Sequence, residues 1–241
     1  MSKKKASTYF VLVVLFFLPV AFLLLLYPAT HNYTPLEVIK ENVEDLNGFT
    51  SNSNEPIQLK EHITVLGFLG ANPIEHTIAA SNLKELVYDK FKGFKKFQIV
   101  MLLPLGTEAS VETIKKEISS YESLEYWHFA FASPGHIKRV YNSLKTNQPL
   151  AEDLYTQKVF VVDKDLNQRG RFDDREDKEK EKNKPVYGLN GYDCIEVAEI
   201  KNKMSDDLRV LFTEYRQKRK GEFENTDTRR ANDLKSNHEE N

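Results

Sequence analysis

The chain has 241 residues, with 34 Lys and Arg against 36 Asp and Glu and a formal net charge of -2. This balance gives no electrostatic case for nucleic acid as a partner. The only cysteine, Cys194, excludes an intramolecular disulfide, a redox-active thiol pair and a cysteine-rich metal site within one chain.

The N-terminal segment predicts a membrane anchor. Lys3–Lys5 precede an uncharged apolar run, Tyr9–Tyr27, which is close to the ~20 residues that cross a ~30 Å hydrocarbon layer. The lysines place residues 1–8 in the cytoplasm and the rest of the chain on the periplasmic side of the inner membrane. A cleaved signal peptide is the alternative, but its apolar region is typically ~7–15 residues long and ends at a small-x-small site. Because Tyr27-Pro28-Ala29-Thr30 is a poor match, we expect an uncleaved single span at 9–27.

A polar stretch separates this anchor from the rest. Residues 28–56 are rich in Asn, Thr, Ser and Glu, so we expect a tether; a flexible chain of about 28 residues spans on the order of 30 Å. The roughly 200 residues after the anchor suffice for one domain with its own core. We place that domain at 57–215.

The first half of the domain predicts an α/β fold. Ile63–Leu69 and Phe97–Leu103 are continuous apolar runs, typical of strands buried on both faces. Between them helical spacing sets in, with the apolar face at Ile78, Leu83, Leu86, Val87 and Phe91. A helix from about Ser110, carrying Val111, Ile114 and Ile118, and a third strand at Tyr126–Phe131 repeat the alternation. Strand, helix, strand, helix indicates parallel crossover units.

The first helix has a well-marked start. Asn72 suits an N-cap, Pro73 the first helical position and Glu75 the third, where a carboxylate is favourable near the positive helix end. Capping alone therefore accounts for these three residues.

The second half predicts a helix, a hairpin and a last helix. Apolar residues at Ile137, Val140, Tyr141 and Leu144 indicate the helix. Lys158–Val162 and Gln168–Phe172 then flank the polar turn Asp163–Asn167, which we expect to be a hairpin at the sheet edge. The turn opens like a calcium loop, but Gln168 stands where that loop needs glycine and no glutamate closes it.

The C-terminal part is strongly charged. Residues 173–184 predict a solvated loop. Asp193 can cap a last helix, whose apolar stripe comprises Val197, Ile200, Met204, Leu208, Leu211 and Tyr215. Residues 216–241 have few large apolar side chains and predict a disordered or exposed tail.

Three stretches carry a family resemblance. They are Asn72-Pro73-Ile74-Glu75-His76, Trp127-His128-Phe129 and Phe160–Asp165 with Gly170. Together with the order of elements after one anchor, they resemble the Sco/SenC family of membrane-anchored copper-delivery proteins over about Leu59–Tyr215. The resemblance implies a thioredoxin-like domain, with a central mixed sheet flanked by helices, and a role beside a respiratory oxidase.

The metal ligands of that family are missing. The resemblance places its two cysteines at Asn72 and His76, spaced as C-x-x-x-C, and its histidine at about Tyr155. The soft thiolate ligands that select Cu(I) are therefore absent. We expect no catalytic residue, no cofactor and no bound metal at these degenerate positions.

Two local alternatives stay open. A remodelled site could use His76 to bind a metal or to transfer a proton, with other histidines approaching in space, namely His62, His128 and His136. Zinc sites need three or four convergent ligands, however, and no His-x-x-x-His motif offers them. Cys194, near the start of the last helix, could become a reactive thiolate, although a lone cysteine is usually a small buried hydrophobe.

These observations lead to a first hypothesis of a non-catalytic accessory protein that acts by contact in the assembly of a respiratory oxidase or another envelope complex. Its partners are the membrane, through Tyr9–Tyr27, and a membrane protein. A second hypothesis is a metal carrier or enzyme that uses His76. A third is a general envelope scaffold with the charged tail as its contact element.

Overall fold

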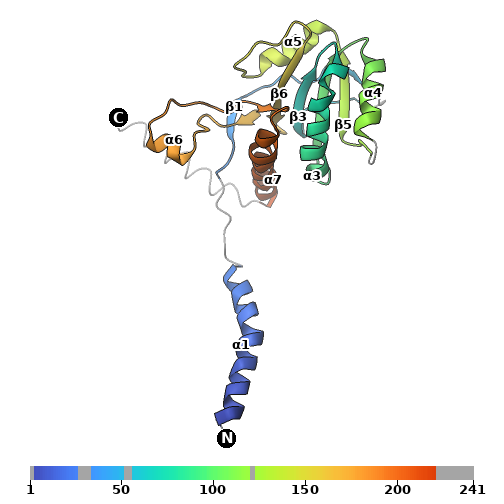
Figure 1. Cartoon of the computed structure of the whole chain (residues 1–241). Coiled ribbons are helices and arrows are strands. Elements are labelled where there is room, and N and C mark those ends of the chain that lie inside the picture. Colours follow the sequence, from blue (N-terminus) through green and yellow to red (C-terminus); the bar gives the residue numbers. More distant parts are fainter. Residues whose placement is uncertain (1–2, 27–33, 52–55, 120–122, 221–241) are drawn as a thin grey trace. The chain divides into compact units, whose positions relative to one another are not determined.

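The computed structural model describes residues 3–26, 34–51, 56–119 and 123–220 (Figure 1). The chain forms two compact units, Met1–Thr34 and Pro35–Asn241. In the first unit, helix α1 (Lys3–Leu26) exposes its apolar side chains from Phe10 to Phe22. Among the described residues, no helix is long and apolar enough to cross a membrane. The span predicted for Tyr9–Tyr27 is therefore not supported by this finding, and Tyr27 lies outside the described residues.

The second unit is built on an 8-stranded mixed sheet, with the order β1-β7-β6-β3-β4-β5-β2 and with β8 paired to β6 outside this path. Strands β3, β4 and β5 run parallel, and the other pairings are antiparallel. The strands are β1 (Glu37–Lys40), β2 (Thr50–Ser51), β3 (Ile63–Leu69), β4 (Phe97–Pro104), β5 (Trp127–Ala132), β6 (Tyr155–Val162), β7 (Gln168–Gly170) and β8 (Tyr192–Asp193).

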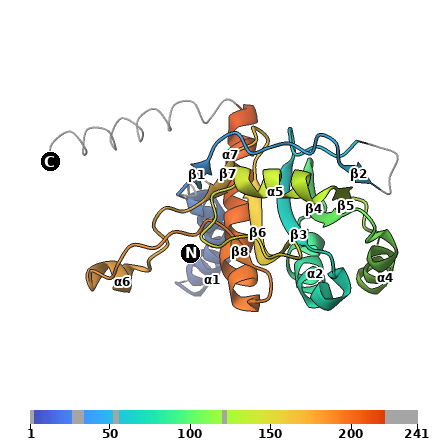
Figure 2. The same cartoon turned by 90° about the horizontal axis from the view of Figure 1, so that it is seen from above.

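Helices cover both faces of this sheet. One continuous helical stretch follows β3, made of a 3-10 turn η1 (Pro73–His76), α2 (Thr77–Leu83), a π turn η2 (Lys84–Tyr88) and α3 (Asp89–Phe91). The others are α4 (Glu108–Ile118), α5 (Pro134–Ser143), α6 (Asp177–Glu181), η3 (Glu199–Met204) and α7 (Ser205–Lys220). Figure 2 separates α5 from α2 and α4 across the sheet. The predicted mixed sheet flanked by helices is thus confirmed.

Two cores explain why the strands contain continuous apolar runs. Val65 and Ile99 point into a core shared with α2, α4 and α7. Their neighbours Leu66 and Val100 point into a second core, which α5 and the side chains of Val43 and Leu46 complete. Because successive side chains in a strand alternate between faces, a strand buried on both sides is apolar at every position.

The predicted tether at 28–56 is wrong for its described part. From Pro35 the chain belongs to the second unit, and this segment supplies β1 and β2. Leu36, Ile39, Val43 and Leu46 are buried beneath an otherwise polar surface. Residues 27–33 and 52–55 lie outside the described residues.

The predicted hairpin is correct as β6 and β7 but does not lie at the sheet edge. Strand β6 pairs with β3 in the middle of the sheet, and β1 pairs with the outer side of β7. The edge position was wrong because the strand in the supposed tether was not anticipated. In the turn, Asp163 Oδ1 accepts hydrogen bonds from the backbone N–H groups of Asp165 and Asn167, both at 2.9 Å.

The charged stretch 173–184 is not only a solvated loop, because it contains α6. Glu176 and Glu179 form a reciprocal capping box at its start. Glu179 also accepts hydrogen bonds from Lys184 Nζ at 2.8 Å and from the Tyr187 hydroxyl at 2.6 Å. Local hydrogen bonds and charge pairs therefore order α6, a helix that has no buried residue.

The last helix follows the prediction in its middle and departs from it at both ends. Ile200, Met204, Leu208 and Leu211 are buried, whereas Val197 is exposed. Helix α7 continues to Lys220, so the start of the predicted tail at 216 is helical. Residues 221–241 lie outside the described residues.

A buried arginine joins four segments of the second unit. Arg169, on β7, donates to Asp163 Oδ2 at 2.9 Å, to Glu214 Oε2 at 2.6 Å and to the Leu36 carbonyl at 2.6 Å. The three charged side chains are no more than 5% exposed. This cluster ties the hairpin turn and α7 to the beginning of the domain.

We expect Arg169→Met to lower the free energy of unfolding by about 3–5 kcal/mol, because two buried carboxylates would lose their partner. Urea unfolding followed by the fluorescence of Trp127, the single tryptophan, measures this loss. The matched control is Arg209→Met, which removes an exposed pair with Asp206 and should change the stability by less than about 1 kcal/mol. Equal stability of the two variants would refute the structural role of the cluster.

Candidate functional site

The site lies at the carboxyl end of β3, where a sharp turn leads into η1. Gly70 has a positive φ of 72°, and the Ala71 N–H donates to the Asp153 carbonyl at 2.7 Å. A Cβ on Gly70 would lie 2.9 Å from both that carbonyl oxygen and Tyr155 Cβ. The turn therefore needs glycine because of its φ and because the 153–155 backbone packs directly against it.

A stacked ring pair forms the centre of the site. The His76 and Tyr155 rings lie parallel, at an interplanar angle of 4° and a centroid separation of 3.4 Å. Tyr155 is the first residue of β6 and pairs with Leu69, the last residue of β3. The strand register thus brings the tyrosine beside the helical turn that carries His76. Two of the three positions that the sequence resemblance aligns with copper ligands are thus in contact.

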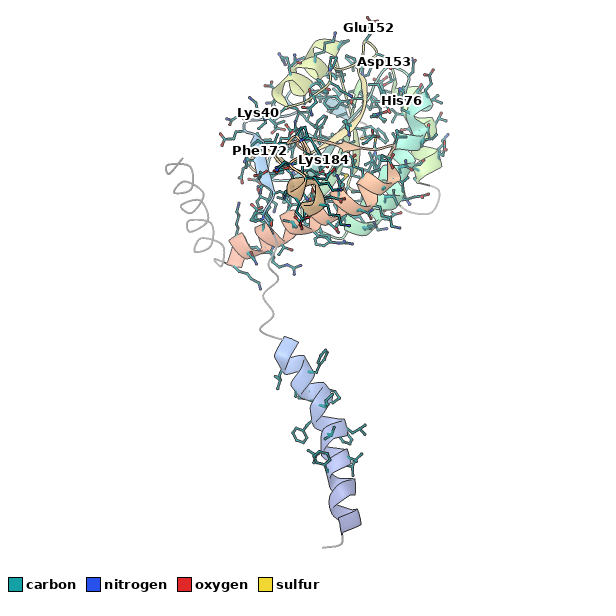
Figure 3. The ribbon with its side chains drawn as sticks, turned by 60° about the vertical axis from the view of Figure 1, so that its left-hand side comes forward. Lys40, His76, Glu152, Asp153, Phe172 and Lys184 are labelled. Carbon is teal, nitrogen blue, oxygen red and sulfur yellow. The ribbon has the colours of Figure 1, made fainter. Side chains whose placement is uncertain are left out.

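Asp153 adds a carboxylate beside this pair. Its Oδ2 lies 3.8 Å from His76 Nε2, within reach of an ion pair when the imidazole is protonated. Figure 3 labels both residues, which lie next to each other at this end of the domain. Within the described residues, His76 Nε2 is buried and has no hydrogen-bond partner. The imidazole is held by packing more than by hydrogen bonds.

Burial keeps Tyr155 protonated. Desolvation, reinforced by the nearby Cys194, Asp193 and Asp153, raises the pKa of the Tyr155 phenol to about 12. At neutral pH the residue is a neutral phenol and not a phenolate ligand. The stack therefore offers one imidazole and one phenol, which is not the soft ligand set that Cu(I) requires.

Asn72 does not cap the helical turn that follows it. Its side chain makes no capping hydrogen bond and is exposed. The predicted positions of Asn72 before the turn and of Pro73 at its start are correct, but the predicted cap bond is wrong. The hydroxyl of Thr77 instead donates to the Ile74 carbonyl at 2.7 Å.

Cys194 is inert. Its side chain is buried, and the thiol donates to the Gln157 carbonyl with an Sγ to oxygen distance of 2.8 Å. Burial, together with the Asp193 carboxylate, raises the pKa of the thiol to about 12. Helical structure begins only at Val197, so the helix start cannot activate the thiol. The alternative of a buried cysteine is confirmed, and these features give no support to that of a reactive thiolate.

Among the described histidines, His62, His128 and His136 do not converge on His76, and His128 lies on β5 opposite Val100. His62 precedes β3 at the opposite end of the strand and bonds to the Lys60 carbonyl. His136, at the start of α5, bonds to Ser133 on the other face of the sheet. In the described part of the chain, no three His, Cys, Asp or Glu side chains form a group that could hold a metal ion.

Exposed apolar side chains, called the apolar rim below, lie on the segments next to the site, and the sequence did not predict them. Ile74, Ile78, Ile195 and Val197 are between 43% and 66% exposed. Asn82 Nδ2 donates to the Cys194 carbonyl at 3.0 Å and so joins α2 to the segment with Ile195 and Val197. Ile78 and Val197 were predicted to be buried; instead, Ala79, Ala80, Leu83 and Val87 form the buried face. Ile74, Ile78 and Asn82 are spaced four residues apart, so they lie on one face of the helical stretch. The polar Asn82 is the sequence signal that this face is not the buried one.

No protein-family model matches the chain, and no curated protein matches it. Solved structures do match. BsSco, described as a member of the Sco family of cytochrome c oxidase assembly proteins, is 14% identical with a TM-score of 0.43, over 72% of this chain and 95% of its own. A putative electron transfer protein from Aquifex aeolicus is 14% identical with a TM-score of 0.45, over 70% of this chain and 94% of its own.

Copper-bound ScoI from Bradyrhizobium japonicum is 13% identical with a TM-score of 0.39, over 69% of this chain and 98% of its own. The chain is thus similar to structures of the Sco family, as the resemblance of its motifs predicts. At TM-scores below 0.5, this likeness assigns no ligand, partner or activity to it.

Alanine substitutions at three glycines distinguish backbone strain from close packing as the reason why the turn needs Gly70. Gly70→Ala meets both a positive φ and close contacts, Gly106→Ala a φ of 95° with open space, and Gly93→Ala open space only. Backbone strain costs about 1–2 kcal/mol, so Gly106→Ala should lose about that much in urea unfolding, Gly93→Ala none, and Gly70→Ala more than either. Equal losses for Gly70→Ala and Gly106→Ala would contradict tight packing at the site.

Proposed function

We propose that the chain is a non-catalytic, membrane-attached accessory protein that acts by contact at the apolar rim around the His76–Tyr155 stack. The carrying observation is that exposed apolar side chains lie on the segments next to a ring pair that lacks the soft ligands of a copper site. Apolar side chains gathered at one place on a surface favour a protein partner.

Chemistry at this site has little support. A disulfide exchange needs a second thiol, and Cys194 is the only cysteine. Its buried, protonated thiol is also a poor nucleophile. Acid-base work by His76 would need a ring nitrogen open to a substrate, whereas its Nε2 is buried. These features support contact in preference to turnover.

The partner we propose is a respiratory oxidase or its assembly machinery. This part of the proposal rests on the sequence resemblance at residues 72–76, 127–129 and 160–170. BsSco belongs to a family of cytochrome c oxidase assembly proteins, and we extend the assembly role to this chain without its copper.

We further propose that α1 attaches the chain to the cytoplasmic membrane, with Lys3–Lys5 on the cytoplasmic side and the second unit in the periplasm. The support is an uncharged apolar sequence between Tyr9 and Tyr27, together with apolar side chains that α1 exposes from Phe10 to Phe22. Exposed apolar helix surface of this extent is favourable in lipid and costly in water.

Contact at the rim is tested by crosslinking in native membranes. The double variant Ile74→Glu/Ile78→Glu should reduce capture of the partner by at least about tenfold, because two charges would be desolvated in the interface. The captured protein is identified by mass spectrometry. The matched control is Val186→Glu, at a residue that is 62% exposed and lies just after the charged stretch 173–184; this variant should capture as the wild type does.

Two outcomes would overturn this proposal. Capture without any oxidase subunit or oxidase assembly factor would favour a general envelope scaffold. Stoichiometric metal in the purified chain that is lost in His76→Ala would favour the metal carrier, since the contact proposal requires no metal.

Membrane attachment is tested on its own by alkaline carbonate extraction of cell membranes. The full chain should stay with the lipid, while a chain without residues 1–27 should be released and keep its fold by circular dichroism. Protease added to intact spheroplasts should digest the second unit. Release of the full chain by carbonate, or protection of the second unit from protease, would contradict the proposed attachment.

A further inference from the structure

A basic cleft lies at the opposite end of β3 from the His76–Tyr155 stack. It encloses about 690 Å³ between Ile63 at the start of β3, the loop before β4 and the last turns of α7. Because β3 has seven residues, the two ends of this strand are about 20 Å apart. The cleft is therefore a second surface, separate from the apolar rim.

Positively charged side chains line this cleft. The charged side chains of its lining are all positive, namely Lys90, Lys95, Lys164, Arg216, Lys218 and Arg219. Lys218 is paired with Glu214 at 2.8 Å, and Lys90 contacts the Ser205 hydroxyl at 3.4 Å.

Within the described residues, no ion pair involves Lys95, Lys164, Arg216 or Arg219. Burial, with repulsion from Arg219 and Lys96, lowers the pKa of Lys164. Cations held this close repel one another, and an anion between them would relieve that repulsion.

The floor of the cleft is aromatic. Phe94 and Phe212 stack at a centroid distance of 4.2 Å. Beside them, the Tyr215 ring has Lys164 Nζ and Lys218 Nζ each 5.1 Å from its centroid. The Tyr215 hydroxyl donates to Asp165 at 3.1 Å, so this carboxylate is already bonded. The cleft thus combines cations at its mouth with an apolar floor.

The start of the second unit lies at the same end of α7. The Leu36 carbonyl accepts from Arg169, which also bonds Glu214, one turn before Lys218. Seven residues, 27–33, separate Leu26, at the end of α1, from Thr34, and such a segment reaches at most about 30 Å. The cleft therefore belongs to a unit that a short segment joins to α1.

We propose that this cleft binds the phosphate headgroup of an anionic phospholipid, with the aromatic floor taking the first part of the acyl or glycerol moiety. The choice of a lipid over a free phosphate rests on the membrane attachment proposed above. Binding here would hold the opposite end of β3, with its apolar rim, away from the lipid and toward a partner.

Native mass spectrometry of the full chain in nonionic detergent tests this inference independently of attachment, because both variants keep α1. Phosphatidylglycerol should bind more tightly than phosphatidylcholine, and inorganic phosphate should compete only weakly. Lys164→Gln/Arg219→Gln should weaken phosphatidylglycerol binding by more than about tenfold, at about fivefold for each cation. Lys138→Gln/Arg139→Gln removes the same charge from exposed positions on α5 and should leave binding unchanged.

Three outcomes would overturn the proposal. They are equal binding of the two lipids, equal loss in both double variants, and full competition by inorganic phosphate. Residues 221–241 are a rival occupant, since they carry six acidic against three basic residues. Lipid binding that arises only in a chain ending at Lys220 would assign the cleft to this tail instead. If carbonate releases the full chain from membranes but the chain still selects phosphatidylglycerol, the proposed attachment fails and this inference stands.

Discussion

The buried Arg169 cluster is the constraint on which the arrangement of the second unit depends. A guanidinium on β7 holds Asp163 of the hairpin turn, Glu214 of α7 and the Leu36 carbonyl at the beginning of the domain. Two carboxylates around one cation are stable in a low-dielectric interior only when their hydrogen bonds are made. The cluster therefore sets where α7 lies on the sheet and where the chain joins it. The position of α7, whose last turns line the basic cleft, in turn fixes one wall of that cleft.

The two candidate surfaces follow from the register of a single strand. Leu69 pairs with Tyr155 at the carboxyl end of β3, which places the tyrosine against His76. At the other end, Ile63 pairs with Phe97, and the loop before β4 meets α7. A slip of one residue would turn every side chain of β3 to the opposite face, so the double-sided core holds both surfaces in place.

The sequence predicts what depends on local pattern and misses what depends on a neighbour. The range Ile63–Leu69 is confirmed residue for residue, since burial on both faces leaves no polar position. Strand β1 was missed because its four residues, Glu37–Lys40, bury only one side chain. The outward direction of Ile78 depends on which part of its helix contacts the sheet. The high pKa of the Cys194 thiol depends on packing by residues that are distant in the sequence. The contact of His76 with Tyr155 could be expected only from the resemblance, which aligns both with ligand positions.

The stack also shows how a helical turn and a loop can be held together without a metal. A metal bound by two thiolates and an imidazole draws a helical turn and a loop together through short bonds. In this chain the rings of His76 and Tyr155 occupy that junction in van der Waals contact, and Gly70 lets the 153–155 backbone approach closely. The loop is therefore held in place without a metal, and its exposed isoleucines keep a defined position. A rigid apolar rim costs less entropy on binding than a mobile one, which is the property that a protein acting by contact needs.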